Sequence, residues 1–149
     1  MSHWKYKGEP FDEIPNGFFV FVYRITHKKS GKKYIGRKYF HTTRRKPLTK
    51  RQKKAGRKRR DIIRKESDWR EYTGSSKVLN EMIEKNPKGF DYEILALGKT
   101  KGQVNLLEEL LHWKYNVLFD DSYINDSVGA RRYIGVKIDE EFKQIVMSL

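Results

Sequence analysis

Apolar residues in the first third of the chain form two short runs separated by a polar turn. Residues 18–25 (FFVFVYRI) are a continuous apolar and aromatic run, with the residue types and the length of a buried β-strand. A turn containing Ser30-Gly31 follows, and residues 33–36 (KYIG) resume the strand pattern. The two runs predict a β-hairpin with a rather long loop, and residues 1–16 are expected to form an irregular lead-in.

The middle of the chain predicts a helix followed by a third strand. Ser75 or Ser76 is a suitable N-cap for a helix that ends near residues 86–89. Its apolar stripe has helical spacing and consists of Val78, Leu79, Met82 and Ile83. Residues 90–97 then alternate in the manner of a strand.

The last third predicts one long helix and a short terminal one. Thr100 and Gln103 have the spacing of a capping box, so a helix should run from about 103 to 119. A short extended piece follows at residues 123–126, and residues 139–147 have the pattern of a terminal helix. A second Tyr-Ile-Gly at residues 133–135 has no partner run at the right spacing, and we interpret it as chance.

The order strand, strand, insertion, helix, strand, helix predicts a small α/β (α+β) fold. We expect a three-stranded, mostly antiparallel sheet flanked by helices, with a basic insertion after the second strand. A chain of 149 residues fits a single domain, here residues 1–149.

Net charge is concentrated in residues 37–65. This segment holds 15 of the 33 Lys and Arg residues and one of the 19 acidic residues, so it carries the whole net charge of +14. A neutral body with one cationic segment indicates a polyanion-binding device. A membrane surface is the competing polyanion, but Leu48, Ile62 and Ile63 are too few to form an apolar anchor, so nucleic acid is favoured.

Within the insertion we expect a loop and one short helix near residues 57–66. The cations expected to contact nucleic acid are Arg37, Arg45, Lys46, Lys50, Arg51, Lys53, Lys54, Arg57, Lys58, Arg59 and Arg60. Few asparagines or glutamines lie among them, so no base specificity can be inferred from this segment.

The composition also limits the chemistry and the location. The chain has no cysteine, which excludes disulfides and thiolate metal sites and leaves carboxylate and imidazole as possible ligands. It has no run of 18 apolar residues and no apolar segment after the N-terminus that would suit a secretory signal. We therefore expect no membrane partner and a cytoplasmic location.

The long helix carries one carboxylate at a special position. Its apolar stripe is expected to contain Val104, Leu107, Leu110, Leu111 and Leu118. Glu109 falls nearly opposite that stripe, whereas Glu108 lies about 90° from its centre, at the boundary between core and solvent. A boundary carboxylate can hold a hard cation and remain open to phosphate, which favours Glu108. His112 shares that flank and is interpreted as an ordinary polar residue.

Val22-Tyr23, ten intervening residues and then Tyr34-Ile35-Gly36 resemble the motif pair of the GIY-YIG nuclease family. The resemblance covers roughly residues 18 to 127, although Phe21-Val22-Tyr23 lacks the glycine of the first motif. The family includes homing endonucleases, restriction enzymes and repair nucleases. The alternative is that Tyr23 and Tyr34 only pack within a strand pair.

The resemblance implies roles for residues in the hairpin and in the helix. Tyr23 would act as general base or orient the attacking water, with its phenol acidified by nearby cations. Tyr34 would line the same pocket. Glu108 would bind a single Mg²⁺ or Mn²⁺ that polarises the phosphate and stabilises the leaving oxygen.

The resemblance also implies supporting residues. A cation after the second motif would brace the transition state, and Arg44, Arg45 and Lys38 all remain candidates. Asn125 resembles the late asparagine that supports the site. His41 and Tyr72 stand where the family has extra hydrogen-bonding groups, and Tyr72 is also expected to contact the nucleic acid.

Together these features predict a divalent-metal-dependent endonuclease that acts on DNA. The chain leaves no room for a separate DNA-binding domain, which is typical of a stand-alone phage or mobile-element nuclease (then in the host-cell cytoplasm) or of a compact restriction-like enzyme. The alternatives are a non-catalytic nucleic-acid-binding module, including an RNA-binding one whose tyrosines stack on bases, and a ribosome-associated protein. Oligomeric state is not predicted.

Overall fold

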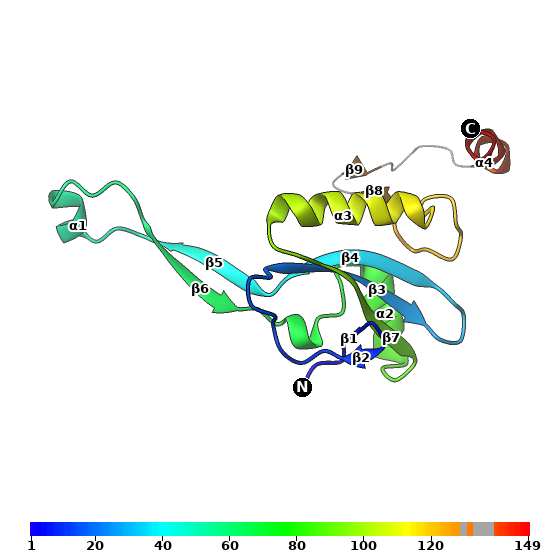
Figure 1. Ribbon diagram of the computed structural model, residues 1–149, viewed down its shortest axis with the longest axis horizontal. Coiled ribbons are helices and arrows are strands. Elements are labelled where there is room, and N and C mark those ends of the chain that lie inside the picture. The colour runs from blue at the N-terminus through cyan, green and yellow to red at the C-terminus, as the bar shows by residue number, and fades with distance from the viewer. Residues whose placement is uncertain (129–130, 133–138) are drawn as a thin grey trace.

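The computed structural model describes residues 1–128, 131–132 and 139–149. Its centre is an antiparallel sheet in which β3 (Val20–His27) lies between β4 (Lys33–Tyr39) and β7 (Phe90–Gly98) (Figure 1). The predicted hairpin and third strand are therefore confirmed. The α+β class is also confirmed, because helices pack on this sheet.

The sheet has five strands rather than the expected three. β1 (Lys5–Tyr6) and β2 (Glu9–Pro10) form a small hairpin, and the strand order is β2-β1-β7-β3-β4. β1 runs parallel to β7, whereas the other neighbouring pairs are antiparallel. The prediction of an irregular lead-in was wrong, because two-residue strands are too short to produce a periodic pattern.

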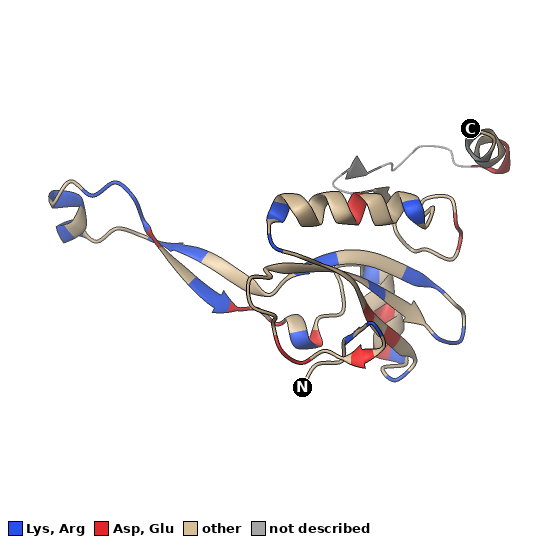
Figure 2. Cartoon of the chain, in the orientation of Figure 1, with Lys and Arg blue, Asp and Glu red and all other residues tan. Residues whose placement is uncertain are grey.

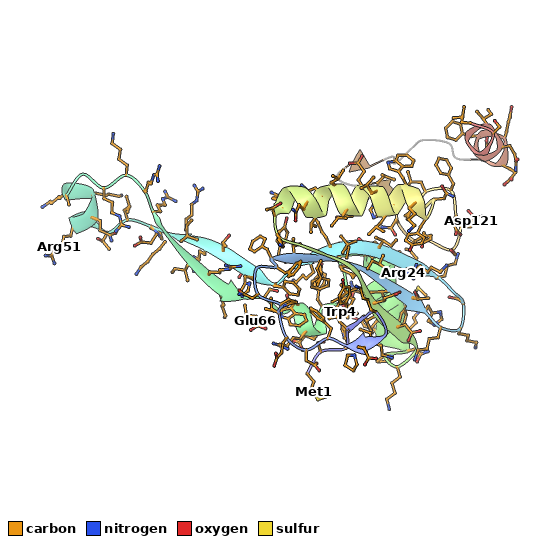
Figure 3. All side chains as sticks on the ribbon, in the orientation of Figure 1. Met1, Trp4, Arg24, Arg51, Glu66 and Asp121 are labelled. Carbon is orange, nitrogen blue, oxygen red and sulfur yellow. The ribbon has the colours of Figure 1, made fainter. Side chains whose placement is uncertain are left out.

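The two faces of the sheet bury two separate clusters. Side chains alternate along a strand, so β3 directs Phe21 and Tyr23 to one face and Val20 and Val22 to the other. The first cluster is aromatic and includes Trp4, which lies in the interior in Figure 3. α2 (Lys77–Lys85) contributes to this first cluster, whereas α3 (Lys101–Lys114) covers the second.

Both main helices have the predicted N-cap residues, Ser76 and Thr100. The Ser76 hydroxyl accepts a hydrogen bond from the Leu79 amide at 3.3 Å, and the Thr100 hydroxyl accepts one from the Gln103 amide at 3.1 Å. The latter helix ends at Lys114 and not near residue 119. Its end is set by a turn that includes Asn116, whose φ of 50° lies in the left-handed region.

The basic insertion forms a protruding arm, defined here as residues 41–66 (Figures 1 and 2). β5 (His41–Lys46) pairs with β6 (Asp61–Glu66), and the short helix α1 (Lys50–Lys54) lies at the tip. The predicted loop with a helix near residues 57–66 was wrong. A capping box between Thr49 and Gln52 starts the helix earlier, and the β-branched pair Ile62-Ile63 belongs to a strand.

The remaining elements are short. The 3-10 turn η1 (Trp69–Glu71) leads from the arm toward α2, β8 (Ser127–Val128) pairs with β9 (Arg131–Arg132), and the predicted terminal helix is present as α4 (Glu140–Met147). The second Tyr-Ile-Gly, residues 133–135, lies outside the described residues. Among the helices that the structure describes, none is long and apolar enough to cross a membrane.

Candidate active site

A cleft of about 620 Å³ lies at β4, the edge strand of the sheet. Segments far apart in the sequence line it: the β3–β4 hairpin, the start of α2, the middle of α3, and residues 124–127, which lead into β8. The lining residues are Tyr23, Tyr34, Gly36, Arg37, Ser75, Ser76, Lys77, Val78, Glu108, Ile124, Asp126 and Ser127. The two motif tyrosines and the helix carboxylate selected from the sequence therefore meet in one place.

Tyr23 lies almost fully inside the protein, with its hydroxyl held between two glycines. A Cβ atom added to Gly36 would lie 2.5 Å from the Tyr23 hydroxyl oxygen, and one added to Gly74 would lie 3.2 Å from it. Gly74 also has a φ of 86°, which L side chains rarely adopt. Gly36 is thus needed because any larger residue would displace the phenol.

Burial sets the acidity of Tyr23. The side chain is 1% exposed, and this burial raises its pKa well above 10.0, with further contributions in the same direction from Tyr34, Tyr72 and Glu108. The expectation that nearby cations acidify this phenol was therefore wrong. At neutral pH, Tyr23 presents a protonated hydroxyl.

Tyr34 lines the cleft beside Tyr23 and is more exposed. The two ring centroids are 6.3 Å apart, and the Tyr34 hydroxyl lies 3.3 Å from the Ser75 hydroxyl just before α2. A bulge in the pairing of β3 with β7 falls between Val22 and Tyr23. Bulges of this kind redirect side chains near functional sites, here the side chain of Tyr23.

Glu108 is a buried carboxylate whose negative charge is only partly compensated by nearby cationic groups and hydrogen bonds. It is 8% exposed, and its Oε2 has no hydrogen-bond partner among the described residues. The Arg37 Nε lies 3.6 Å from Oε2, and the His112 Nε2 lies 3.8 Å from Oε1. Burial raises the pKa of Glu108 to about 7, although Arg37 opposes this shift.

The buried face of α3 differs from the predicted one. Val104, Glu108 and His112 face inward, whereas Leu110 is exposed. Glu108 was expected at the boundary and His112 on a polar flank, and both expectations were wrong. The His112 Nε2 lies 3.3 Å from the Ile35 carbonyl oxygen, which can only accept, so this nitrogen donates. Desolvation lowers the pKa of His112 and favours its neutral form.

Asn125 binds the backbone of the second motif. Its Oδ1 accepts a hydrogen bond from the Ile35 amide at 3.0 Å, and its Nδ2 donates one to the Ile35 carbonyl at 2.7 Å. Close by, the Ile124 amide donates to the Lys33 carbonyl at 2.8 Å. This segment therefore satisfies the outer edge of β4 as another strand would, and holds Tyr34 and Gly36 in place.

Two cations line the cleft, Arg37 on β4 and Lys77 at the start of α2, and Arg37 is the one that lies beside Glu108. The sequence had indicated Arg37 only as a phosphate contact. Lys38 lies in a neighbouring groove, where its Nζ is 2.5 Å from Asp68 Oδ1 and 3.9 Å from the centre of the Tyr72 ring. Tyr72 also packs against Tyr23, with ring centroids 6.0 Å apart.

The other candidates lie on the arm and outside the cleft lining. Arg44 and Arg45 are exposed on β5. His41 stands at the base of the arm, where its Nδ1 is 3.3 Å from Arg64 Nη2. The remaining predicted phosphate contacts are all exposed on the arm: Lys46, Lys50, Arg51, Lys53, Lys54, Arg57, Lys58, Arg59 and Arg60.

The cleft fits a metal ion bound by a single protein carboxylate. The described residues contain no group of three or more His, Asp or Glu side chains that could enclose an ion. Glu108 nevertheless supplies a buried oxygen that accepts no hydrogen bond from the part of the chain that the structure describes. A hard divalent cation with one carboxylate ligand, water and substrate phosphate oxygens is a common arrangement for Mg²⁺.

Comparison with protein families gave a match over most of the chain. Residues 4–128 match the family described as "Putative endonuclease segE, GIY-YIG domain". The matched range includes the whole arm and every residue that lines the cleft. No curated protein and no solved structure matches the chain. Because the match covers most of the chain, the protein belongs to the GIY-YIG endonuclease domain family of the segE type.

Proposed function

We propose that the protein is a divalent-metal-dependent endonuclease that hydrolyses phosphodiester bonds in DNA. Membership of an endonuclease domain family implies a nucleic-acid substrate. The observation that carries the proposal is the buried Glu108 Oε2, which has no hydrogen-bond partner in the described residues and lies in a cleft with Tyr23, Tyr34 and Arg37.

Tyr23 is suited to orient the attacking water. A free phenolate would be a poor resting state in this environment, because burial raises the Tyr23 pKa. The protonated hydroxyl can hold a water molecule or a phosphate oxygen at a fixed position, since Gly36 and Gly74 pack against it. Tyr34, anchored near Ser75, offers a second hydroxyl at the same cleft.

Arg37 is suited to stabilise the charge on the phosphate. Its guanidinium lies on β4 beside Glu108 and is half-buried, so its charge is less screened than that of the cations on the arm. Guanidinium groups form two parallel hydrogen bonds with phosphate oxygens. Arg37 is therefore our candidate for the group that braces the transition state.

Glu108 would hold the divalent cation, Mg²⁺ or Mn²⁺. When bound, the ion polarises the phosphate and stabilises the leaving oxygen. Glu108 must be ionised for this role, and its pKa of about 7 means that part of the population is protonated at neutral pH in the absence of metal. A bound cation favours the ionised form, so metal binding should release a proton.

The rival proposal is a basic module that binds nucleic acid without cutting it. In such a module the Glu108 carboxylate would lower the affinity for nucleic acid, because it would repel the phosphates. The rival predicts that neutralising Glu108 improves binding, whereas an endonuclease should lose cleavage and retain binding.

The test is cleavage of supercoiled plasmid with Mg²⁺, with Mn²⁺ and with EDTA, with a folded RNA tested alongside. Glu108→Gln is compared with Glu109→Gln, which removes an exposed carboxylate from the next position of the same helix. We expect metal-dependent cleavage of DNA by the wild type and by Glu109→Gln but not by Glu108→Gln. DNA binding without cleavage by all three proteins would support the rival.

A further inference from the structure

The arm has no hydrophobic core of its own. β5 and β6 pair from His41↔Glu66 out to Lys46↔Asp61, and almost every residue of the two strands is exposed. The tip helix α1 has no buried residue. An isolated two-stranded ribbon is marginally stable in water, so such an arm is expected to gain order by packing against a ligand.

Charge restricts the ligand to a polyanion. Residues 41–66 hold 13 Lys and Arg residues against Asp61 and Glu66, and the cations extend along the arm to its tip in Figure 2. Arg51, labelled in Figure 3, lies at the tip. The base of the arm is fixed to the body, because the Arg64 guanidinium lies 5.2 Å from the Phe19 ring and the Ser67 amide donates to the Phe40 carbonyl at 2.9 Å.

Shape and exposed apolar residues indicate how this polyanion is bound. The major groove of B-form DNA admits a two-stranded ribbon, whereas the major groove of A-form RNA is too deep and narrow for side chains to read. Ile62 and Ile63 are 65% and 49% exposed and point to opposite faces of the ribbon. Contacts with phosphates do not require exposed isoleucine side chains. The thymine methyl groups of the major groove are apolar surfaces on which such side chains can pack.

We propose that the arm inserts as a β-ribbon into the major groove of double-stranded B-form DNA beside the cleft. This inference rests on the proposed function and adds how the arm holds the DNA duplex. Each strand of the ladder has six residues. At a rise of about 3.3 Å per residue, the ribbon spans roughly 20 Å, or about six base pairs. The arm should therefore protect DNA on one side of the cleavage position.

Chemical protection of the two grooves is the first test. Glu108→Gln protein in EDTA is bound to a 30-base-pair duplex, and methylation of guanine N7 (major groove) and of adenine N3 (minor groove) is measured. We expect the bound protein to lower methylation of N7 while N3 stays as reactive as in free DNA. Protection of N3 instead, or equal competition by a duplex RNA, would overturn the proposal.

Two arm variants test the roles of the apolar residues and of the tip. The double variant Ile62→Ser, Ile63→Ser removes apolar contacts with the groove, so it should lower duplex affinity about 10-fold. It removes no charge, so the dependence of affinity on salt should stay unchanged. A shortened arm replaces residues 47–60, which hold eight cations, by Asn-Gly between the paired Lys46 and Asp61. If about half of those cations contact phosphates, the affinity ratio of the two proteins should change on the order of 100-fold between roughly 50 and 200 mM salt.

The control removes three exposed lysines remote from the arm, as Lys29→Gln, Lys85→Gln and Lys88→Gln, and should leave protection unchanged. An unchanged affinity of the two-serine variant would overturn groove insertion, because phosphate contacts alone would then explain binding. Failure of the wild type to cleave plasmid would instead refute the proposed function. The two failures are distinguishable, since protection is measured without metal on a Glu108→Gln protein.

Discussion

Replacing Glu108 by Gln should stabilise the folded protein at alkaline pH. The substitution keeps the shape of the side chain and removes a charge that the fold does not fully compensate. Burial raises the pKa of this carboxyl from 4.5 to about 7, and Arg37 offsets only part of that effect. The folded protein therefore holds a proton on Glu108 at pH values where the unfolded chain has released it.

The sign and the size of the effect follow from that shift. Below pH 4.5 the carboxyl is protonated in both states and contributes nothing to the pH dependence. As pH rises from 4.5 to about 7, the unfolded state loses its proton first, so stability falls. Each unit of pKa shift is worth about 1.4 kcal/mol, which gives a cost of about 3 kcal/mol above pH 7. Glutamine does not carry this cost.

The assay is urea unfolding of the wild type, Glu108→Gln and Glu109→Gln in EDTA, at pH 5 and pH 8.5. The difference between wild type and Glu108→Gln removes the contributions of other titrating groups, such as His112. We expect a difference of less than about 1 kcal/mol at pH 5 and an advantage of about 3 kcal/mol for Glu108→Gln at pH 8.5. Equal pH dependence of wild type and Glu108→Gln would show that burial does not raise the pKa of Glu108. A Glu109→Gln variant that behaves like Glu108→Gln would show the same.

Two further predictions concern the packing around β4. Gly36→Ala should destabilise the fold by about 1–3 kcal/mol in urea unfolding, because its Cβ would lie 2.5 Å from the Tyr23 hydroxyl. Adding Tyr23→Phe should recover part of that loss, and purely additive effects would contradict the assigned contact. Asn125→Ala should cost about 1–3 kcal/mol and speed hydrogen exchange at the Ile35 amide, whose bond to Asn125 is 3.0 Å long. Unchanged exchange at that amide would show that Asn125 does not hold β4.

The three long strands of the sheet were predictable because β3 is apolar on both buried faces and the residues of β7 alternate. The run at residues 18–25 and the paired tyrosines were enough to place Tyr23 and Tyr34 on neighbouring strands. The small β1–β2 hairpin was not predictable, since two-residue strands leave no period to detect. Its place beside β7 depends on Trp4 packing into the aromatic cluster, which is a tertiary contact.

Helix α3 shows why the apolar pattern was misleading at the site. Leu106, Leu110 and Trp113 are exposed, whereas Glu108 and His112 occupy inward positions that apolar residues would otherwise fill. The leucines therefore indicated a buried face rotated away from the true one. Departures of this kind from local rules are expected at functional sites, where polar groups are kept in the interior at a cost.

Arg37 and the arm were obscured by the surrounding charge. Arg37 begins a segment rich in cations, and only its position on β4 beside Glu108 distinguishes it from the others. In the arm, the ribbon was missed because its residues are exposed on both faces, so they show no alternation. Its only sequence signals were the capping box of Thr49 with Gln52 and the Ile62-Ile63 pair.

Binding of Mn²⁺ tests whether Glu108 is the metal ligand, because the bound ion can be counted by its paramagnetic resonance signal. Wild type, Glu108→Gln and Glu109→Gln are titrated with Mn²⁺ while bound to a duplex that carries uncleavable linkages. We expect one tightly bound ion per chain in the wild type and in Glu109→Gln, and loss of that ion in Glu108→Gln. Equal Mn²⁺ binding by all three proteins would contradict the assignment of Glu108 as the metal ligand.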